Sequence, residues 1–442
     1  MTYGALSIPA YWLKDYTLSA FNSLLALWIV FNVVTFILGA LLNIYIPYCM
    51  RQATISAEPE PVVTTTHLEA RNQEKHSSHS TAFAIGHEEE QPPNVKSSAR
   101  KYGFAMSILG TLGNAFGACL MLGITIILAR YLTADAGQSA GLIVTTVMGF
   151  VTVLLGVPVY FGLPALPTKP WPTRGGWRTA LTELATPYRE MFLHKRNMMF
   201  LLIAYTVYSD TLFALYSLTS QLYFIEVQPD TFEYSLYTLS GNLFWALLTV
   251  VFYVAQLHFK WDLGKVLIIG YALILIIPIW GCIGLANIED FGLKVSVHSV
   301  PALIPQQQTL LVFRASTNHA SQKRWEFYVQ VLIFYGSQAI VNPTFRLLYA
   351  ELVPAGEEIM WFGLQVILSC ATTWVNYVAT APLQNHTHNL RFPIVLCLVM
   401  LIVPLVLEYL RATMDMFKRE SDVVEPGTMR DVDDSRMASE SV

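Results

Sequence analysis

One aspartate lies in an apolar stretch of the chain, where a charge is costly. Asp210 stands near the middle of residues 198–222, and an acidic side chain at the centre of a membrane helix costs about 2.5–3.5 kcal/mol. Neighbouring Leu, Ile, Phe and Val residues each return roughly 0.3–0.6 kcal/mol, so the segment can still insert. Such an aspartate can bind a substrate or carry a proton in a central cavity. The alternative is structural, with hydrogen bonds from Ser, Thr or Tyr on a neighbouring helix.

Three further polar side chains are candidates to share this site. Tyr205 and Tyr208 precede Asp210 by five and two residues, which places them about 140° and 160° away around a helix. Neither ring therefore stacks over the carboxylate. Asn242, in the next apolar segment, is a candidate partner across the cavity. We interpret these four residues as substrate-binding or coupling candidates.

A second group of charges surrounds the end of a later apolar segment. Arg346 is followed by Glu351, Glu357 and Glu358 in a short turn. A guanidinium forms paired hydrogen bonds with carboxylates, so Arg346 could bind a carboxylate of the substrate. It could instead reach the membrane surface or pair with these glutamates. We favour the second interpretation, a gate formed by Arg346, Glu351 and Glu358.

The composition indicates a membrane protein. Hydrophobic residues make up 54% of the 442, charged residues only 13%, and the mean hydropathy is +0.45, outside the range of soluble domains. The net charge of −4 is small and dispersed, so no nucleic-acid partner is predicted. Five cysteines without CxxC spacing indicate free thiols rather than disulfides or a metal site. No enzyme motif is present, and neither an enzyme activity nor a cofactor is predicted.

Nine segments are long and apolar enough to cross a bilayer, which takes about 20 helical residues. They cover residues 20–48, 103–130, 139–163, 198–222, 235–257, 265–287, 327–350, 359–383 and 392–410. Only helices satisfy the backbone in lipid at this hydropathy. The predicted fold is therefore an all-α membrane protein, surrounded by membrane lipid. Gly113 and Gly117 form a small-xxx-small pair that suggests close helix packing.

The basic residues predict the orientation. Loops 49–102, 164–197, 258–265 and 351–358 and the tail 411–442 together carry 19 Lys and Arg residues, whereas the loops on the opposite side carry seven. Basic residues concentrate in cytosolic loops. The first set is therefore predicted to be cytosolic, and the gate formed by Arg346, Glu351 and Glu358 would close the cytosolic side.

Two long polar stretches are predicted to be disordered. Residues 51–101 contain four histidines (His67, His76, His79 and His87), but Ser, Thr, Pro, Glu and Gln dominate the composition, so disorder is favoured over metal binding. The tail 411–442 is interpreted in the same way. The basic stretch 164–197 is interpreted as a cytosolic linker.

The stretch from Ala350 to Leu364 reads AELVPAGEEIMWFGL. It resembles the pattern A-E-L-x-P-x-G-x-E-x-x-x-F-x-L of the autophagy-related protein 22 family, vacuolar effluxers within the major facilitator superfamily. Residues 200–210, with a tyrosine and an aspartate, resemble the seventh helix of that family. There are departures: Phe345 stands where a serine is expected, and Asn376-Tyr377 where Gly-Pro is expected.

The resemblance implies a major-facilitator-like bundle of twelve helices, of which about nine are present. Residues 1–163 would then be a partial N-terminal half lacking three helices, and 198–410 a complete six-helix half. Residues 295–322 interrupt the second half as a foreign-looking insert, which we interpret as translated intron sequence.

The function implied by the resemblance is export of amino acids from the vacuole to the cytosol after autophagic degradation, by alternating access. Two alternatives remain open. One is a non-transporting remnant or regulatory membrane protein of the same fold. The other is a facilitator-type transporter of another small solute.

Overall fold

The structure is a computed structural model of the 442-residue chain. It describes residues 2–13, 17–57, 93–131, 140–162, 182, 188–189, 191–193, 195–227, 229–283, 324–354, 357–387 and 391–428. Within these ranges the chain is helical and forms no strand. The predicted linker 164–197 lies largely outside them, and the predicted insert 295–322 lies wholly outside them.

Nine long helices correspond to the nine predicted segments within the described ranges. They are preceded by two short ones, and the full order is α1 (Thr2–Ser7), η1 (Ile8–Leu13), α2 (Leu18–Ala57), α3 (Pro93–Tyr131), α4 (Ala140–Gly162), α6 (Arg196–Val227), α7 (Thr231–Phe259), α8 (Leu263–Ile283), α10 (Arg324–Leu352), α11 (Glu358–Thr387) and α12 (Arg391–Thr428). Among the described residues, seven helices are long and apolar enough to cross a membrane. The other two are α10, which carries several polar side chains, and α11, in which only Met360–Ser369 is sufficiently apolar.

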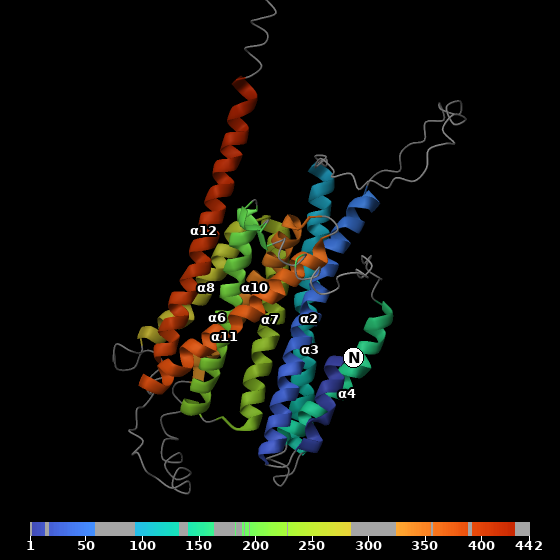
Figure 1. The fold of residues 1–442 in the computed structure, drawn as a ribbon, viewed down its shortest axis with the longest axis vertical. Coiled ribbons are helices and arrows are strands. Elements are labelled where there is room, and N and C mark those ends of the chain that lie inside the picture. The colour runs from blue at the N-terminus through green and yellow to red at the C-terminus, as the bar shows by residue number, and fades with distance from the viewer. Residues whose placement is uncertain are drawn as a thin grey trace, which may run out of the picture.

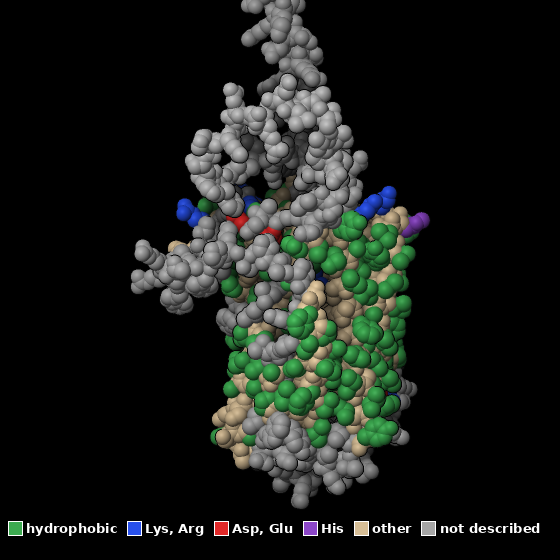
Figure 2. All heavy atoms as spheres, turned by 90° about the vertical axis from the view of Figure 1, so that its right-hand side faces the viewer, with side chains coloured by type: hydrophobic (Ala, Val, Ile, Leu, Met, Phe, Trp, Pro, Cys, Tyr) green, Lys and Arg blue, Asp and Glu red, His purple; other side chains and the backbone are tan. Residues whose placement is uncertain are grey.

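The outer surface of the bundle suits lipid. Large apolar side chains such as Phe116, Leu154 and Leu247 are exposed. On the face drawn in Figure 2, hydrophobic side chains cover the body of the molecule and charged ones gather toward one end. An apolar outer surface of this extent is removed from water only when the hydrocarbon of a bilayer surrounds it. The chain is a multi-pass membrane protein.

The helices form two groups that pack against each other, the first containing α2, α3 and α4 and the second α6 to α12 (Figure 1). In the second group, α6 packs against α10, α11 and α12, while α8 lies between α10 and α12. In the first group, α2 packs against α3. The groups meet where α3 packs along α7, where α2 packs along α11, and where α10 contacts both α3 and α2. The ring of Phe104 on α3 lies 5.8 Å from those of Phe252 and Tyr253 on α7.

The prediction that Gly113 and Gly117 support close helix packing is wrong. A Cβ atom added at either position meets nothing within 4 Å, because none of the described helices lies against that face of α3. Close approach occurs instead at Gly241 and Gly270, where an added Cβ would fall less than 3.0 Å from side chains of α10. Small residues permit helix contact only where a second helix is present to use them.

The ion pairs at the two ends of the bundle agree with the predicted distribution of the loops between the two sides of the membrane. At one end, Arg100 at the start of the α3 span pairs with Glu351 at 2.8 Å. At the other end, Arg324 at the start of α10 lies 3.4 Å from Glu233 near the start of α7. Residues 51–101 and 351–358 therefore share one side of the membrane. Which side faces the cytosol stays a prediction from the basic residues.

Several helices continue beyond the predicted boundaries. Helix α2 reaches Ala57 and α3 begins at Pro93, so both ends of the predicted disordered stretch 51–101 are helical, and residues 58–92 lie outside the described ranges. Helix α12 continues to Thr428, which corrects the predicted disordered tail for residues 411–428 (Figure 1). These extensions are rich in Lys, Arg, Met and Glu, which favour helix.

The first residues were not predicted to be structured. Helices α1 and η1 pack against α4, and the hydroxyl of Thr146 donates to the carbonyl oxygen of Ile8 at 3.2 Å.

Candidate functional site

Asp210 is buried between α6 and α11. The residue is 4% exposed, and its carboxylate accepts hydrogen bonds from the hydroxyls of Ser369, at 3.3 Å, and Thr372. These two donors lie three residues apart and so share one face of α11. The Thr372 hydroxyl also lies 2.9 Å from the carbonyl oxygen of Leu368. Since a hydroxyl has a single proton, Thr372 can donate to Asp210 or to the backbone, but not fully to both.

The two tyrosines face away from this carboxylate, toward α10. The ring of Tyr205 stacks on Phe345 with centroids 3.5 Å apart, and its hydroxyl donates to Asn342 Oδ1 at 3.4 Å. The Tyr208 hydroxyl lies 2.8 Å from Ser337 Oγ. The angular separation predicted from the helix period holds, because the tyrosines and Asp210 contact different helices.

The Ser337 hydroxyl fixes the direction of its own hydrogen bonds. It donates to the carbonyl oxygen of Gly270 on α8 at 2.9 Å. Because its one proton is used there, Tyr208 must be the donor to Ser337. Helices α6, α10 and α8 are therefore connected by a continuous chain of two buried hydrogen bonds.

Asn242 is not the partner of Asp210. Its amide nitrogen donates to the carbonyl oxygen of Thr238 at 2.9 Å and lies 3.5 Å from the hydroxyl of Tyr335 on α10. The residue is buried on α7, which contacts α10 and α3, whereas Asp210 faces α11. The rotation of α6 about its axis decides which helix receives Asp210, and the sequence does not determine that rotation.

Arg346 and Glu351, which were predicted to form a gate together, contact different partners. Glu351 pairs with Arg100 of α3 rather than with Arg346. Arg346 instead donates through Nη1 to the hydroxyl of Thr111 on α3 at 3.4 Å. Burial raises the pKa of Glu351 above its ordinary value, and Arg100 acts in the opposite direction. The ion pair that joins the two helix groups at this end is therefore Arg100–Glu351.

The turn after α10 is held by its own contacts. Trp361 donates through Nε1 to Glu357 Oε2 at 3.0 Å, and Tyr349 donates to the carbonyl oxygen of Trp361 at 2.6 Å. The ammonium group of Lys195 lies 5.1 Å from the centre of the Trp361 ring, a cation–π distance. Glu358, the third predicted gate residue, begins α11.

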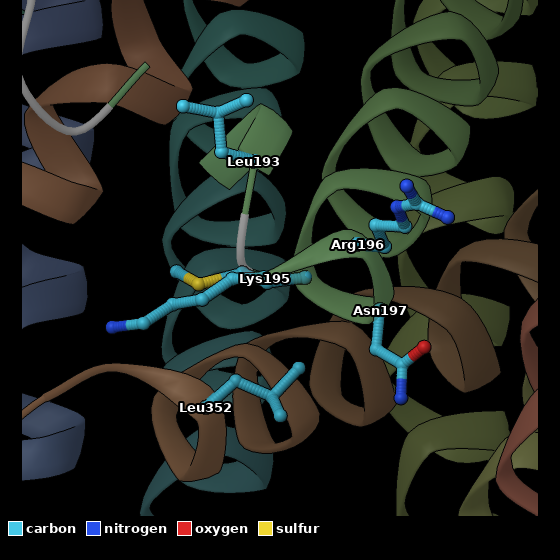
Figure 3. Close-up of a pocket in the computed structure, with 6 residues that line it drawn as sticks. Leu193, Lys195, Arg196, Asn197 and Leu352 are labelled. Atoms are coloured by element: carbon cyan, nitrogen blue, oxygen red, sulfur yellow. The ribbon is translucent and has the colours of Figure 1, made fainter. Parts of the chain in front are cut away.

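A cavity of about 360 Å³ opens at this same end of the bundle. It is lined by residues at the start of α6 (Lys195, Arg196, Asn197 and Met198), with Leu193 before them and Leu352 from the end of α10. Figure 3 shows these side chains around the space between the two helix ends. Asp210 does not line this cavity, so the cavity is an opening at the helix ends rather than the buried site.

One buried ion pair was missed from the sequence. On α12, Arg411 Nε lies 2.9 and 3.0 Å from the two carboxylate oxygens of Glu408. Glu408 is fully buried and Arg411 is 6% exposed. The signal was opposite charges at i and i+3 at the end of an apolar run, but the predicted segment ended at residue 410 and divided the pair.

Comparison with known proteins identifies related sequences. A family model described as vacuole effluxer Atg22 like matches residues 1–421. Autophagy-related protein 22 of Candida albicans is 24% identical over 343 residues, which cover 74% of this chain and 60% of the relative. Autophagy-related protein 22 of Yarrowia lipolytica is 30% identical over 132 residues, covering 30% of this chain and 22% of that relative. The chain thus spans less than two thirds of the length of either relative.

Proposed function

We propose a transport function for this chain, which belongs to the Atg22-like family of vacuole effluxers. In this proposal the protein lies in the vacuolar membrane and exports amino acids to the cytosol after autophagic degradation. The family description supports the vacuole and the direction of movement. Amino acids as the cargo follow from the resemblance of residues 350–364 and 200–210, and no cofactor takes part.

The proposed mechanism is alternating access in a major-facilitator-like bundle. One moving part contains α2, α3 and α4, and the other contains α6 to α12. Two features support this division: the parts meet along α3–α7 and α2–α11, and the Arg100–Glu351 pair connects them at one end. Rocking of one part against the other would open a central site alternately to the two sides.

The observation that carries the proposal is the buried position of Asp210. An ionised carboxylate needs donors, and Ser369 and Thr372 provide two. When Asp210 takes up a proton, Thr372 can return its own proton to the Leu368 carbonyl, which already lies 2.9 Å away. Both protonation states then keep a satisfied hydrogen-bond arrangement. An acidic vacuolar lumen supplies the proton, so Asp210 would couple proton binding to helix movement between α6 and α11.

The test is efflux from preloaded vacuoles that contain the full chain. Asp210→Asn should reach the vacuole, because the amide oxygen can still accept from Ser369. The amide NH2 group can donate to the Thr372 hydroxyl oxygen, whose own proton can go to the Leu368 carbonyl. It should lose the dependence of amino-acid efflux on luminal pH. Asp262→Asn, the same substitution in the short turn between α7 and α8, is the matched control and should behave as the parent. Equal efflux from Asp210→Asn and the parent at every luminal pH would return Asp210 to a structural role.

A further inference from the structure

The side chain of Arg346 points into the bundle rather than toward the nearer membrane surface. Helix α10 ends at Leu352, and that end is marked by the Arg100–Glu351 pair. Arg346 nevertheless hydrogen-bonds Thr111, which lies eleven residues beyond Arg100, or about 16 Å along a helix. Helical side chains lean toward the N-terminus of their helix, and on α10 that direction leads away from Leu352. Arg346 therefore does not snorkel to the surface.

This guanidinium has spare donors. Among the residues that the structure describes, no carboxylate forms an ion pair with Arg346. Its hydrogen bond to Thr111 is long, at 3.4 Å, whereas a guanidinium offers five N–H donors in a planar fork. Two nearby glutamates have other partners: Glu351 of the predicted gate pairs with Arg100, and Glu357 accepts a hydrogen bond from Trp361. A cation at this depth is costly, which favours an anionic partner that arrives from outside the described chain.

The side chains around Arg346 could help to bind such a partner, because several are polar and only partly buried. Asn342 lies one turn before it on the same face of α10, and the Tyr205 hydroxyl lies 3.4 Å from the Asn342 amide oxygen. Tyr205, Asn342 and Arg346 are only partly buried. On α3, Gly110 is exposed, and a Cβ added there would lie 3.7 Å from Arg346 Nη1. The guanidinium is thus bordered by polar groups and by an exposed glycine that has no side chain.

We propose that Arg346, with Thr111, Tyr205 and Asn342 around it, binds the carboxylate of the transported amino acid. The proposal rests on the proposed function and names the part of the substrate that is recognised. The guanidinium fork donates two parallel hydrogen bonds to the two carboxylate oxygens. Thr111 belongs to one moving part and Arg346 to the other, so a carboxylate held here lies between them.

The first experiment uses the unmutated full chain in detergent and the arginine-selective reagent phenylglyoxal, with modification measured at each arginine by peptide mass spectrometry. The probes are a mixture of neutral L-amino acids and the same mixture as carboxamides, which lack the carboxylate. We expect the free acids to slow the modification of Arg346 about tenfold and the amides to leave it unchanged, as charge-assisted recognition predicts. Arg324, paired with Glu233 at the other end, is the internal control and should react equally throughout.

Two results overturn the proposal: equal modification of Arg346 with acids and amides, or no modification of Arg346 in the protein without ligand.

Variants of the chain provide a second, independent experiment. Arg346→Gln should abolish the discrimination between acids and amides in vacuolar efflux, and Arg346→Lys should keep only part of it, because an ammonium lacks the fork. Gly110→Leu, which fills the adjacent space without changing charge, should weaken efflux of the acids, and unchanged efflux counts against the site.

Failure of this inference differs visibly from failure of the proposed function. Absence of efflux from the parent, together with protection of Arg346 by acids, removes the transport function and retains the carboxylate site. Efflux from the parent without any protection of Arg346 has the opposite meaning, and the carboxylate site is then wrong.

Discussion

Removing one partner of the buried Glu408–Arg411 pair should destabilise the chain far more than removing both. Both side chains are almost completely enclosed, at 0% and 6% exposure, so Glu408→Leu leaves a buried guanidinium without its carboxylate. Breaking a buried pair in this way typically costs about 3–5 kcal/mol. Replacing both partners by apolar residues of similar size, as in Glu408→Leu with Arg411→Met, is close to neutral or stabilising, since neither charge then needs to be desolvated.

The measurement is thermal unfolding of the purified full chain in one detergent, followed by loss of the monodisperse species. We expect the midpoint of Glu408→Leu to fall by about 5–10 °C and that of the double variant to stay within about 2 °C of the parent. Glu357→Gln, a partly buried glutamate in the turn before α11, controls for loss of one negative charge.

A single variant as stable as the parent would refute the reasoning. It would mean that another group compensates Arg411. Asp262 is a candidate, because both its carboxylate and the Arg411 guanidinium border Gly264: a Cβ added there would lie 3.3 Å from Arg411 Nη2 and 3.9 Å from Asp262 Oδ1. The double variant Glu408→Leu with Asp262→Asn would then show the loss of thermal stability that the single variant lacks.

Two further predictions concern helix contacts. Gly241→Ala should lower the free energy of unfolding by about 1–3 kcal/mol, because the new methyl group meets the Tyr335 ring and Val331, whereas Gly117→Ala meets nothing in the described chain and should be neutral; equal midpoints in thermal unfolding would contradict this. At the Arg100–Glu351 pair, the raised pKa of Glu351 means that the packed state binds a proton more readily than a state in which Glu351 is exposed. Closure at this end should therefore strengthen as pH falls toward the carboxylate range. Glu351→Gln should preserve closure and Arg100→Gln should weaken it, measured as cross-linking between cysteines placed at Gly103 and Leu347. Cross-linking weakened as much in Glu351→Gln as in Arg100→Gln would show instead that the ion pair itself holds the end closed, and would contradict this prediction.

The sequence predicted the helices well because hydropathy is a local property. Each of the nine apolar segments corresponds to a helix, and the period of α6 correctly separated Asp210 from Tyr205 and Tyr208. Boundaries failed where charged residues extend a helix beyond the membrane, as in residues 411–428 of α12. A segment predicted from hydropathy ends at the first charged residues, whereas the hydrogen-bonded helix backbone can continue past them.

Partners between helices could not be predicted, because they depend on how each helix is rotated and which helix lies beside it. Asn242 was expected opposite Asp210, yet Ser369 and Thr372 occupy that position. Gly113 and Gly117 have the right spacing for a helix contact but no helix against them. Glu351 was grouped with Arg346 by sequence proximity, although its partner is Arg100, 251 positions earlier in the numbering.

The hydrogen-bonded link from Tyr208 through Ser337 to Gly270 has a consequence for the proposed transport cycle. It connects α6, α10 and α8, so in that cycle Arg346, Asn342 and Tyr205 would move together. Thr111 stands on α3, outside that unit. When the parts rock, a bound solute would travel with three of its contacts and lose the fourth. Release would then begin with the loss of the contact to Thr111, while the other three contacts persist. The strength of the contact to this one hydroxyl would therefore influence how long the solute stays bound.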